Sequence, residues 1–233
     1  MNNFDASIVA RAVVGLDPRY SHTFGGPRRH NGTTPRGCAQ PLHLLYTFDT
    51  TDPSFPVRVP GVRYLPLYYS FPYNAGACGY RVLSDNEIEV LYMETETIEP
   101  NFPFEDYPSE FPLAAIQLLP ISYEDHKKLV FAIYAGKDSL SEADRRLVYD
   151  EFNYPFTQLG GHHDLCQGVP SVACPNPACE YHEFDCFMEV FGVVWNVPVD
   201  GVHLWSNDDW DDIQTIFQIC PKCSSIHACN RCT

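Results

Sequence analysis

Six cysteines among the last sixty residues have the spacing that metal ligands need. They form the pairs Cys174-x4-Cys179, Cys220-x2-Cys223 and Cys229-x2-Cys232. Two short cysteine pairs on separate turns can surround one Zn²⁺ ion with four thiolates in a tetrahedron. Because four thiolates leave no open position for water or substrate, such a site stabilises the fold and does not catalyse a reaction. We therefore predict a structural zinc site in this part of the chain.

The first two pairs are the favoured ligands. Both begin with Cys-Pro, and proline favours a tight turn whose backbone amides can point at a sulfur. The two pairs would fasten loops that are separated by forty residues of sequence. We predict that one zinc ion is bound by Cys174, Cys179, Cys220 and Cys223.

The third pair leaves alternatives open. The last two pairs could hold a zinc ion between them, although the five-residue loop that separates them is short for one cage. The first pair would then be spare, or would form a second site with His182 or Cys186. His227 is a further candidate, although a lone histidine is more often an ordinary surface or core residue. Cys229 and Cys232 lie near the chain end, where fraying is expected unless something holds them.

Two other polar segments resemble functional sites less closely. Gly160–Cys166 contains a cysteine and two histidines, but no third group at a recognisable spacing would orient them as a nucleophilic pair. The acidic segment 207–212 lacks the glycine and the spacing of a calcium loop. We interpret both as polar turns. The sequence also lacks a phosphate-binding loop with lysine, a His-Glu-x-x-His motif and a serine elbow, which weakens the case for an enzyme.

The composition favours many short strands around a large core. Of the 233 residues, 45% are hydrophobic, and the chain contains 15 Phe, 14 Tyr and 20 Pro. Aromatic residues are enriched in strands, and proline marks turns. The length suits one large domain or two modest ones. We expect a β-rich α+β fold.

The net charge of −15 restricts the partners. An acidic protein repels a phosphate backbone, so nucleic acid is an unfavourable partner, whereas a basic protein is a favourable one. The alternative is that the negative charge only keeps the protein soluble. Residues 1–10 have neither the basic start nor the apolar run of a signal peptide, and no stretch approaches the ~20 apolar residues of a membrane span. Because paired cysteines without a leader favour metal in a reducing compartment, we expect a cytoplasmic protein that does not enter a membrane.

Hydrophobic patterning predicts the elements that would position the cysteines. Residues 1–40 are expected to be rich in loops, and 100–112 to form a surface loop. Predicted strands cover 42–48, 62–71, 79–83, 87–93, 188–195, 201–205 and 214–219. Ser122 and Ser141 have the pattern of helix caps, so we expect helices that end near Tyr134 and Phe152. The last predicted strand leads directly into Cys220.

The two ends of the chain resemble each other. Gly25-Gly26 and Gly160-Gly161 are followed twelve and thirteen residues later by Cys38 and Cys174. A strand, a Gly-Val step and a strand that ends in proline follow in both places. We interpret this as a degenerate tandem duplication in which Cys38 is the remnant of a ligand. The predicted division is an N-terminal extension (1–20), a first β half-domain (21–110), a helical insert (111–155) and a second β half-domain with the zinc site (156–233).

These motifs resemble the YwqG-like bacterial family and the related eukaryotic programmed-cell-death-two and ribosome-assembly proteins. The resemblance rests on the Gly-Gly opening, a central strand like 42–48, the Cys-Pro knuckle and the aromatic strand into Cys-Pro-x-Cys. It is clearest over about 155–233 and weaker over about 20–95. It implies a duplicated β-rich fold with zinc on the first two cysteine pairs and, for the eukaryotic branch, a dedicated chaperone for a ribosomal protein. The pair Cys229 and Cys232 departs from the family pattern.

We therefore expect a non-catalytic, zinc-stabilised cytosolic module that binds or chaperones a protein client. Two alternatives stay open. One is an immunity-type or regulatory protein that neutralises a basic partner, and the other is an unrecognised hydrolase with a cleft between the halves. A long exposed aromatic strand edge would favour client binding, whereas a deep pocket with perturbed carboxylates would favour an enzyme.

Overall fold

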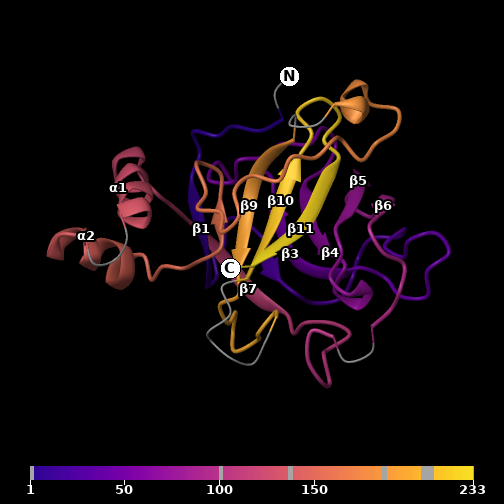
Figure 1. The fold of residues 1–233 in the computed structure, drawn as a ribbon, viewed down its shortest axis with the longest axis horizontal. Helices are drawn as coiled ribbons and strands as arrows, with labels where there is room; N and C mark the ends of the chain where they lie inside the picture. The colour runs from indigo at the N-terminus through magenta and orange to yellow at the C-terminus, as the bar shows by residue number, and fades with distance from the viewer. Residues whose placement is uncertain (1–2, 100–101, 136–138, 185–187, 206–212, 233) are drawn as a thin grey trace.

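The computed structural model describes residues 3–99, 102–135, 139–184, 188–205 and 213–232. Within these ranges, eleven strands form one curled sheet in which neighbouring strands are antiparallel (Figure 1). The strands are β1 (Ala10–Val14), β2 (His22–Phe24), β3 (His43–Asp49), β4 (Tyr64–Tyr69), β5 (Cys78–Ser84), β6 (Glu87–Met93), β7 (Ala114–Pro120), β8 (Gln158–Leu159), β9 (Glu189–Trp195), β10 (Ile213–Ile219) and β11 (Ile226–Cys232). The helices are η1 (Phe71–Tyr73), α1 (Tyr123–Ala135), α2 (Glu142–Arg145), η3 (Arg146–Glu151) and η4 (Glu180–Glu183).

The order of the strands in the sheet does not follow the chain. It runs β4-β3-β2-β7-β1-β8-β9-β10-β11-β5-β6. β1 and β7 lie side by side near the middle, with Ala10 opposite Pro120 and Val14 opposite Ile116. On its other edge β7 pairs with β2, and β1 pairs with β8. Strands from the beginning, middle and end of the chain therefore belong to one sheet, and β11 joins the hairpin β5–β6 to it.

The structure confirms most of the predicted strands and both helix starts. β3, β4, β9 and β10 overlap predicted strands, and β5 and β6 form the predicted hairpin. The hydroxyl oxygens of Ser122 and Ser141 accept hydrogen bonds from the backbone N–H groups of Asp125 and Asp144, both at 3.1 Å. These are the capping bonds that the sequence pattern predicts. The second predicted helix consists of α2 and the π-helical turn η3.

Four strands lie where the sequence predicted something else. β1 and β2 lie in the predicted loop region, β7 lies in the predicted helical insert, and β11 occupies the end that was expected to fray. These segments are short or have a mixed pattern, so pairing with neighbouring strands decides their conformation. Residues 201–205 are not the predicted strand, because they form a turn with one bridge between Val199 and Val202. Leu204 and Trp205 are hydrophobic because they enter the core.

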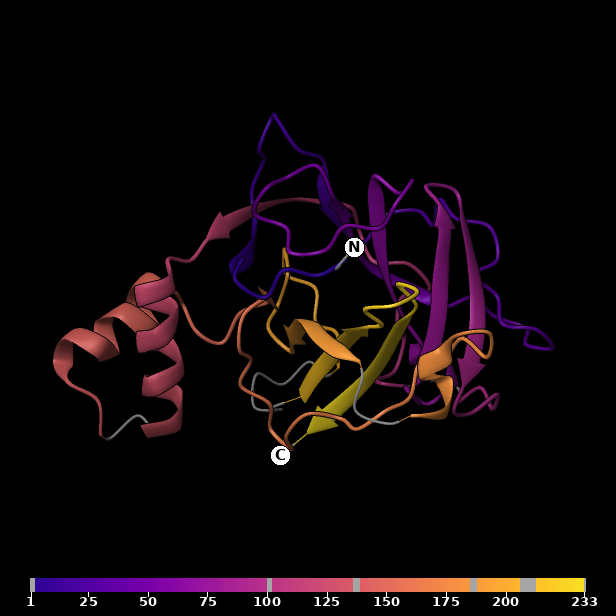
Figure 2. The ribbon, with the colours of Figure 1, turned by 90° about the horizontal axis from the view of Figure 1, so that it is seen from above.

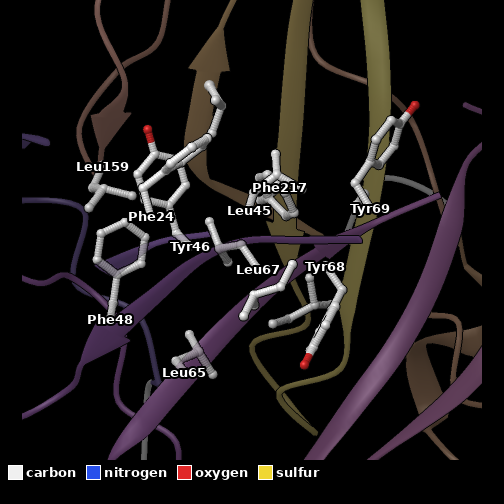
Figure 3. Packing of buried hydrophobic residues seen from close by; sticks show 14 of the residues in the cluster. Phe24, Leu45, Tyr46, Phe48, Leu65, Leu67, Tyr68, Tyr69, Leu159 and Phe217 are labelled. Carbon is white, nitrogen blue, oxygen red and sulfur yellow. The ribbon is translucent and has the colours of Figure 1, made fainter. Parts of the chain in front are cut away.

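The main core collects aromatic side chains from both ends of the chain (Figure 3). β3 is buried on both faces, which explains its continuous hydrophobic run. The ring centroids of Tyr46 and Phe24 lie 5.3 Å apart, and Leu159 from β8 and Phe217 from β10 belong to the same cluster. Each such side chain stabilises the fold by about 1.5–3 kcal/mol on burial. Because both ends supply the core, neither end has a complete core of its own.

The helices α1, α2 and η3 lie together at one side of the sheet (Figures 1 and 2). They pack around a separate small core that includes Leu129 of α1 and Val148 of η3. Tyr123, Phe131 and Tyr134 of α1 stay exposed. Within the described part of the chain, no helix is long and apolar enough to cross a membrane.

His43 and His163 are among the histidines that burial holds as neutral rings. His43 of β3 lies among three aromatic rings, and its Nε2–H donates to the carbonyl oxygen of Pro108 at 2.8 Å. Burial disfavours the charged imidazolium and lowers the pKa of His43 to about 4. Burial, together with the nearby rings of His126 and His162, lowers the pKa of His163 to about 3.

The free energy of unfolding should therefore fall as the pH is lowered from about 6.5 to about 4. Histidine in the unfolded chain has a pKa of about 6.5. Between these two pH values the unfolded state therefore binds protons that the folded state does not bind. Each such group removes up to about 1.4 kcal/mol per pH unit. Urea unfolding at a series of pH values measures the loss.

The His163→Leu variant isolates one of these groups. It should show a flatter pH profile than the unaltered protein, whereas Leu16→Ala, which changes an exposed side chain that does not titrate, should leave the profile unchanged. Any acid effect on the cysteines is common to all three proteins and cancels in the comparison. Equal slopes for His163→Leu and the unaltered protein would show that the buried ring does not carry the effect.

Candidate metal centre

Two turns bring four cysteines together. Cys174 and Cys179 lie in the loop between β8 and η4. Cys220 and Cys223 lie in the turn that joins β10 to β11. Figure 1 shows this yellow turn beside the orange loop that carries η4. The four sulfur atoms all lie within 4.8 Å of one another, so the structure brings together the two pairs that the sequence analysis favoured.

The spacing of the sulfurs fits a tetrahedral metal ion. The Sγ atoms of Cys174 and Cys223 are 3.4 Å apart, and those of Cys179 and Cys220 are 3.8 Å apart. Four sulfurs placed about 2.3 Å from a zinc ion would be separated by about 3.8 Å. The first three cysteines of the set are buried and Cys223 is half-buried. The four cysteines can therefore hold a metal ion in a closed site.

Backbone N–H groups in both turns point at the sulfurs. The sulfur of Cys174 accepts a hydrogen bond from the backbone of Asn176. The sulfur of Cys220 accepts hydrogen bonds from the backbones of Lys222 and Cys223. The Cys-Pro sequence predicted this arrangement, since proline fixes the start of each turn and has no N–H of its own to satisfy. Such donors stabilise negative charge on the sulfurs.

Further contacts hold the second turn in shape. Ser224 has a left-handed backbone with a φ of 60°, and its N–H donates to the carbonyl oxygen of Cys220 at 2.9 Å. The hydroxyl of Ser225 lies 3.2 Å from the sulfur of Cys223. Sequence analysis missed Ser225, although a hydroxyl two residues after a ligand cysteine is a signal that could have identified it.

Contacts among the four sulfurs shift the pKa values of three of these thiols in different directions. Contacts with the sulfurs of Cys220 and Cys223 raise the pKa of Cys174 well above its usual range. Hydrogen bonding with Cys174 lowers the pKa of Cys220, but contact with Cys223 and burial outweigh it and raise the pKa to about 11. Contacts with Cys174 and Cys220 hold the pKa of Cys223 far below its usual range. The protons that remain on these sulfurs are the ones a bound metal ion displaces.

The first turn packs directly on the sheet at Gly79 of β5. A Cβ atom on Gly79 would lie 2.4 Å from the Cβ of Pro175, closer than two carbon atoms can approach, so this contact requires glycine. At the surface, Lys222 Nζ lies 2.8 Å from the carboxylate of Glu180 and links the two turns. Because both side chains are more than half exposed, this ion pair contributes little stability. No feature of the sequence identified Gly79 as a docking position.

The structure does not bring the third cysteine pair to this centre. Cys229 and Cys232 both lie on β11. Successive side chains of a strand point to opposite faces, so residues three positions apart face away from each other. Cys229 is buried in a cluster with Trp195 and Ile216, and Cys232 is exposed. The Cys-x2-Cys spacing converges on a metal when it lies on a turn, and it does not when it lies on a strand.

The other candidate ligands have other surroundings. The Nδ1–H of His182 donates to the carbonyl oxygen of Cys174 at 2.7 Å, so His182 supports the first turn. His227 lies on β11, and its ring stacks with that of Tyr92 at a centroid distance of 6.4 Å. Cys38 lies in the loop between β2 and β3, apart from the four-sulfur group. Cys186 lies outside the described residues.

The two polar segments do not form a second centre in the described structure. In the segment after β8, the backbone N–H of Cys166 donates to the Gln214 side chain at 2.9 Å, and the hydroxyl of Tyr154 donates to Asp164 at 2.8 Å. The acidic segment 207–212 lies outside the described residues. Among the residues that the structure describes, the four cysteines are the one group of three or more metal-ligating side chains close enough to share an ion.

Comparison with known proteins identifies no relative. No protein-family model, curated protein or solved structure matches the chain. The resemblance to the YwqG-like family therefore stays a prediction, and the chemistry of the four sulfurs is the guide to what this centre does.

The Cys220→Ser substitution should lower the melting temperature by at least about 10 °C. Loss of a structural metal removes several kcal/mol, and each kcal/mol corresponds to about 2–4 °C in a chain of this size. Limited proteolysis should show faster cleavage after about residue 155. Cys232→Ser is the matched control, because it makes the same change at an exposed cysteine outside the group, and it should melt within about 2 °C of the unaltered protein. Similar melting temperatures for all three proteins would exclude a stabilising role for the four-sulfur site.

Proposed function

We propose that the four cysteines bind one zinc ion whose role is to hold two turns together. Four thiolates are a ligand set that zinc accepts in structural sites. The observed sulfur spacings of 3.4 and 3.8 Å support this assignment. When bound, zinc supplies four ligand bonds between chain segments and offers no open coordination position. The ion therefore contributes to the free energy of folding and not to a chemical step.

Protein purified without chelators should contain about one zinc ion per chain by elemental analysis. A strong chelator should lower the melting temperature, and added Zn²⁺ should restore it, whereas Mg²⁺ should not because it prefers oxygen ligands. Iron in place of zinc would contradict the assignment, since four cysteines also bind iron. Two zinc ions per chain would show that ligands beyond these four take part.

We also propose that the chain contains two related halves, β1–β4 and β7–β10. The pairing of their strands supports this division. The first strand of each half pairs with the short second strand of the other half, β1 with β8 and β7 with β2. In each half, the second strand pairs with the third and the third with the fourth. The helices α1, α2 and η3 lie between β7 and β8, so the proposed insert is confined to residues 121–157.

Two glycines, two turns and two loops occupy equivalent positions in the two proposed halves, which gives further support. The N–H of Gly25, after β2, donates to β3 at 2.8 Å, and the N–H of Gly160, after β8, donates to β9 at 2.8 Å. Both glycines have positive φ, and a Cβ on either would collide with a backbone oxygen at 2.4 or 1.9 Å. The turn before β4 and the turn before β10 each contain one valine–valine bridge. Cys38 and the first cysteine knuckle occupy the corresponding loops between the second and third strands.

We propose that the protein is a non-catalytic cytoplasmic module that binds a basic protein client. The observation that carries this proposal is the outer strand β6, which ends the described sheet and exposes Tyr92 at 43%. An exposed aromatic strand edge is a feature of proteins that bind extended partners. The net charge of −15 favours a basic partner. The closed geometry of the four-sulfur site supports a structural role for the metal.

A pair of denatured proteins of opposite charge tests this proposal. The zinc-loaded protein should suppress the light scattering of reduced lysozyme, which is basic, and should have little effect on reduced α-lactalbumin, which is acidic. Suppression should weaken between 0.05 and roughly 0.5 M salt, because salt shortens the range of electrostatic attraction. Equal suppression of both proteins would contradict a charge-selective client site, and no suppression of either would contradict the chaperone-like function.

A further inference from the structure

An apolar cleft of about 460 Å³ lies between the first cysteine turn and the end of the sheet. Figure 2 shows the orange loop with η4 against the purple strands β5 and β6. Leu91 and Tyr92 of β6 and His227 of β11 form the sheet side of the cleft, and Val172, Pro175 and Pro177 contribute to the other side. Because Pro175 and Cys174 both line the cleft, one wall depends on the fold of the metal centre.

A β-bulge in β6 directs two neighbouring side chains into this cleft. The register moves from Tyr80 opposite Val90 to Gly79 opposite Tyr92, which leaves Leu91 as the extra residue. Adjacent residues of a regular strand face opposite sides, and a bulge re-aims them. Leu91 and Tyr92 therefore line the same cleft. Gly79 lies between Tyr92 and the β11 strand and has no side chain to fill the space.

His227 contributes an unsatisfied polar atom at the sheet side of the cleft. The residue is 5% exposed, and its Nδ1 atom has no hydrogen-bond partner among the described residues. Most buried polar atoms in proteins have a partner, so one without a partner at a cleft is a feature of an incomplete site. A bound chain segment could complete it, since a peptide carries both donors and acceptors.

The outer edge of β6 is open beside the cleft. At its start, the backbone N–H of Ile88 donates to the carbonyl oxygen of Asn31 at 3.0 Å, so the groups of Ile88 face away from β5. The groups of Val90, two residues later, face the same way because backbone direction alternates along a strand. In the described structure, no segment pairs with this edge over residues 89–93. An unpaired edge is a template for an added strand.

The charge of the edge selects the partner. Residues 87–99 contain five glutamates and no lysine or arginine. All five glutamates are exposed, namely Glu87, Glu89, Glu94, Glu96 and Glu99. Glu89 is paired with Arg81 of β5. A strand added here would therefore meet Glu87 beyond one end of the open edge and Glu94 and Glu96 beyond the other, which favours lysine and arginine side chains.

We propose that the open edge at residues 89–93 and the neighbouring apolar cleft form one groove for an extended basic peptide. The peptide adds a strand to β6, directs one large apolar side chain into the cleft, and presents its basic side chains to the glutamates. This inference rests on the proposed client-binding function and deepens it by naming the site and the kind of segment bound. Because the first cysteine turn forms one wall, binding requires the zinc-loaded protein.

Selection from a library of random ten-residue peptides on the zinc-loaded protein tests the proposal. Recovered peptides should be rich in lysine and arginine and should contain one large apolar residue. Two N-methylated versions of the best peptide test the strand hydrogen bonds, one methylated at the odd-numbered residues and one at the even-numbered residues. The version whose methyl groups replace the N–H groups that face β6 should bind at least tenfold more weakly. Val90→Pro should have a similar effect, because it removes an outward N–H and leaves the pairing with β5 intact.

Charge reversal supplies a matched control. The double substitution Glu87→Lys and Glu96→Lys should weaken peptide binding at least tenfold, whereas Glu105→Lys with Asp150→Lys, which changes the net charge equally at exposed sites elsewhere, should weaken it less than threefold. Thermal melting verifies that each variant is folded. Equal peptide binding by the two double variants would overturn the proposed groove. Unchanged binding of both N-methylated peptides would also overturn it.

The outcomes also separate this inference from the proposed function. A protein that suppresses the scattering of a basic protein equally well with and without Val90→Pro binds its clients elsewhere. In that case the client-binding function stands and the groove does not. The glutamates would then serve to keep the edge of the sheet from pairing with a second copy.

Discussion

The pairing of β1 with β7 is the constraint on which the rest of the structure depends. These two strands join the two parts of the sheet, because β7 also pairs with β2 on one side and β1 also pairs with β8 on the other. The aromatic core can form only when both parts are in place, because Phe24 and Tyr46 pack in one cluster with Leu159 and Phe217. Residues 10–14 are therefore a central element of the sheet, although the N-terminal region looked like an extension in the sequence.

The four-sulfur centre acts at the other end of this sheet. The turn between β10 and β11 presents two of its cysteines, and the loop before η4 presents the other two. The contact of Pro175 with Gly79 fixes this loop against β5. A metal ion at the centre would thus connect a long loop, a hairpin turn and the outer hairpin β5–β6. Through these contacts, a site without an open coordination position can still influence the shape of the outer hairpin β5–β6.

Local signals made part of this structure predictable. The Cys-Pro spacing identified the four clustered cysteines, the serine caps identified both helices, and the long apolar run of β3 identified a strand buried on both faces. The sequence could not identify β1, β7 or β11, because partners far along the chain determine their conformation. Cys229 and Cys232 show the same limit. Their spacing was correct for a metal site, but the pairing of β11 with β10 and β5 turned the two side chains to opposite faces.

The central position of β1 also affects the order of events during synthesis. Both partners of β1 are made much later, because β7 begins at Ala114 and β8 ends at Leu159. A ribosome that adds roughly 5–20 residues per second needs on the order of 10 seconds to reach them. Until β7 has been made, this central strand has neither neighbour, and until β8 has been made it lacks one of the two. The nascent chain therefore passes through a period in which it resembles the unfolded proteins that chaperones protect.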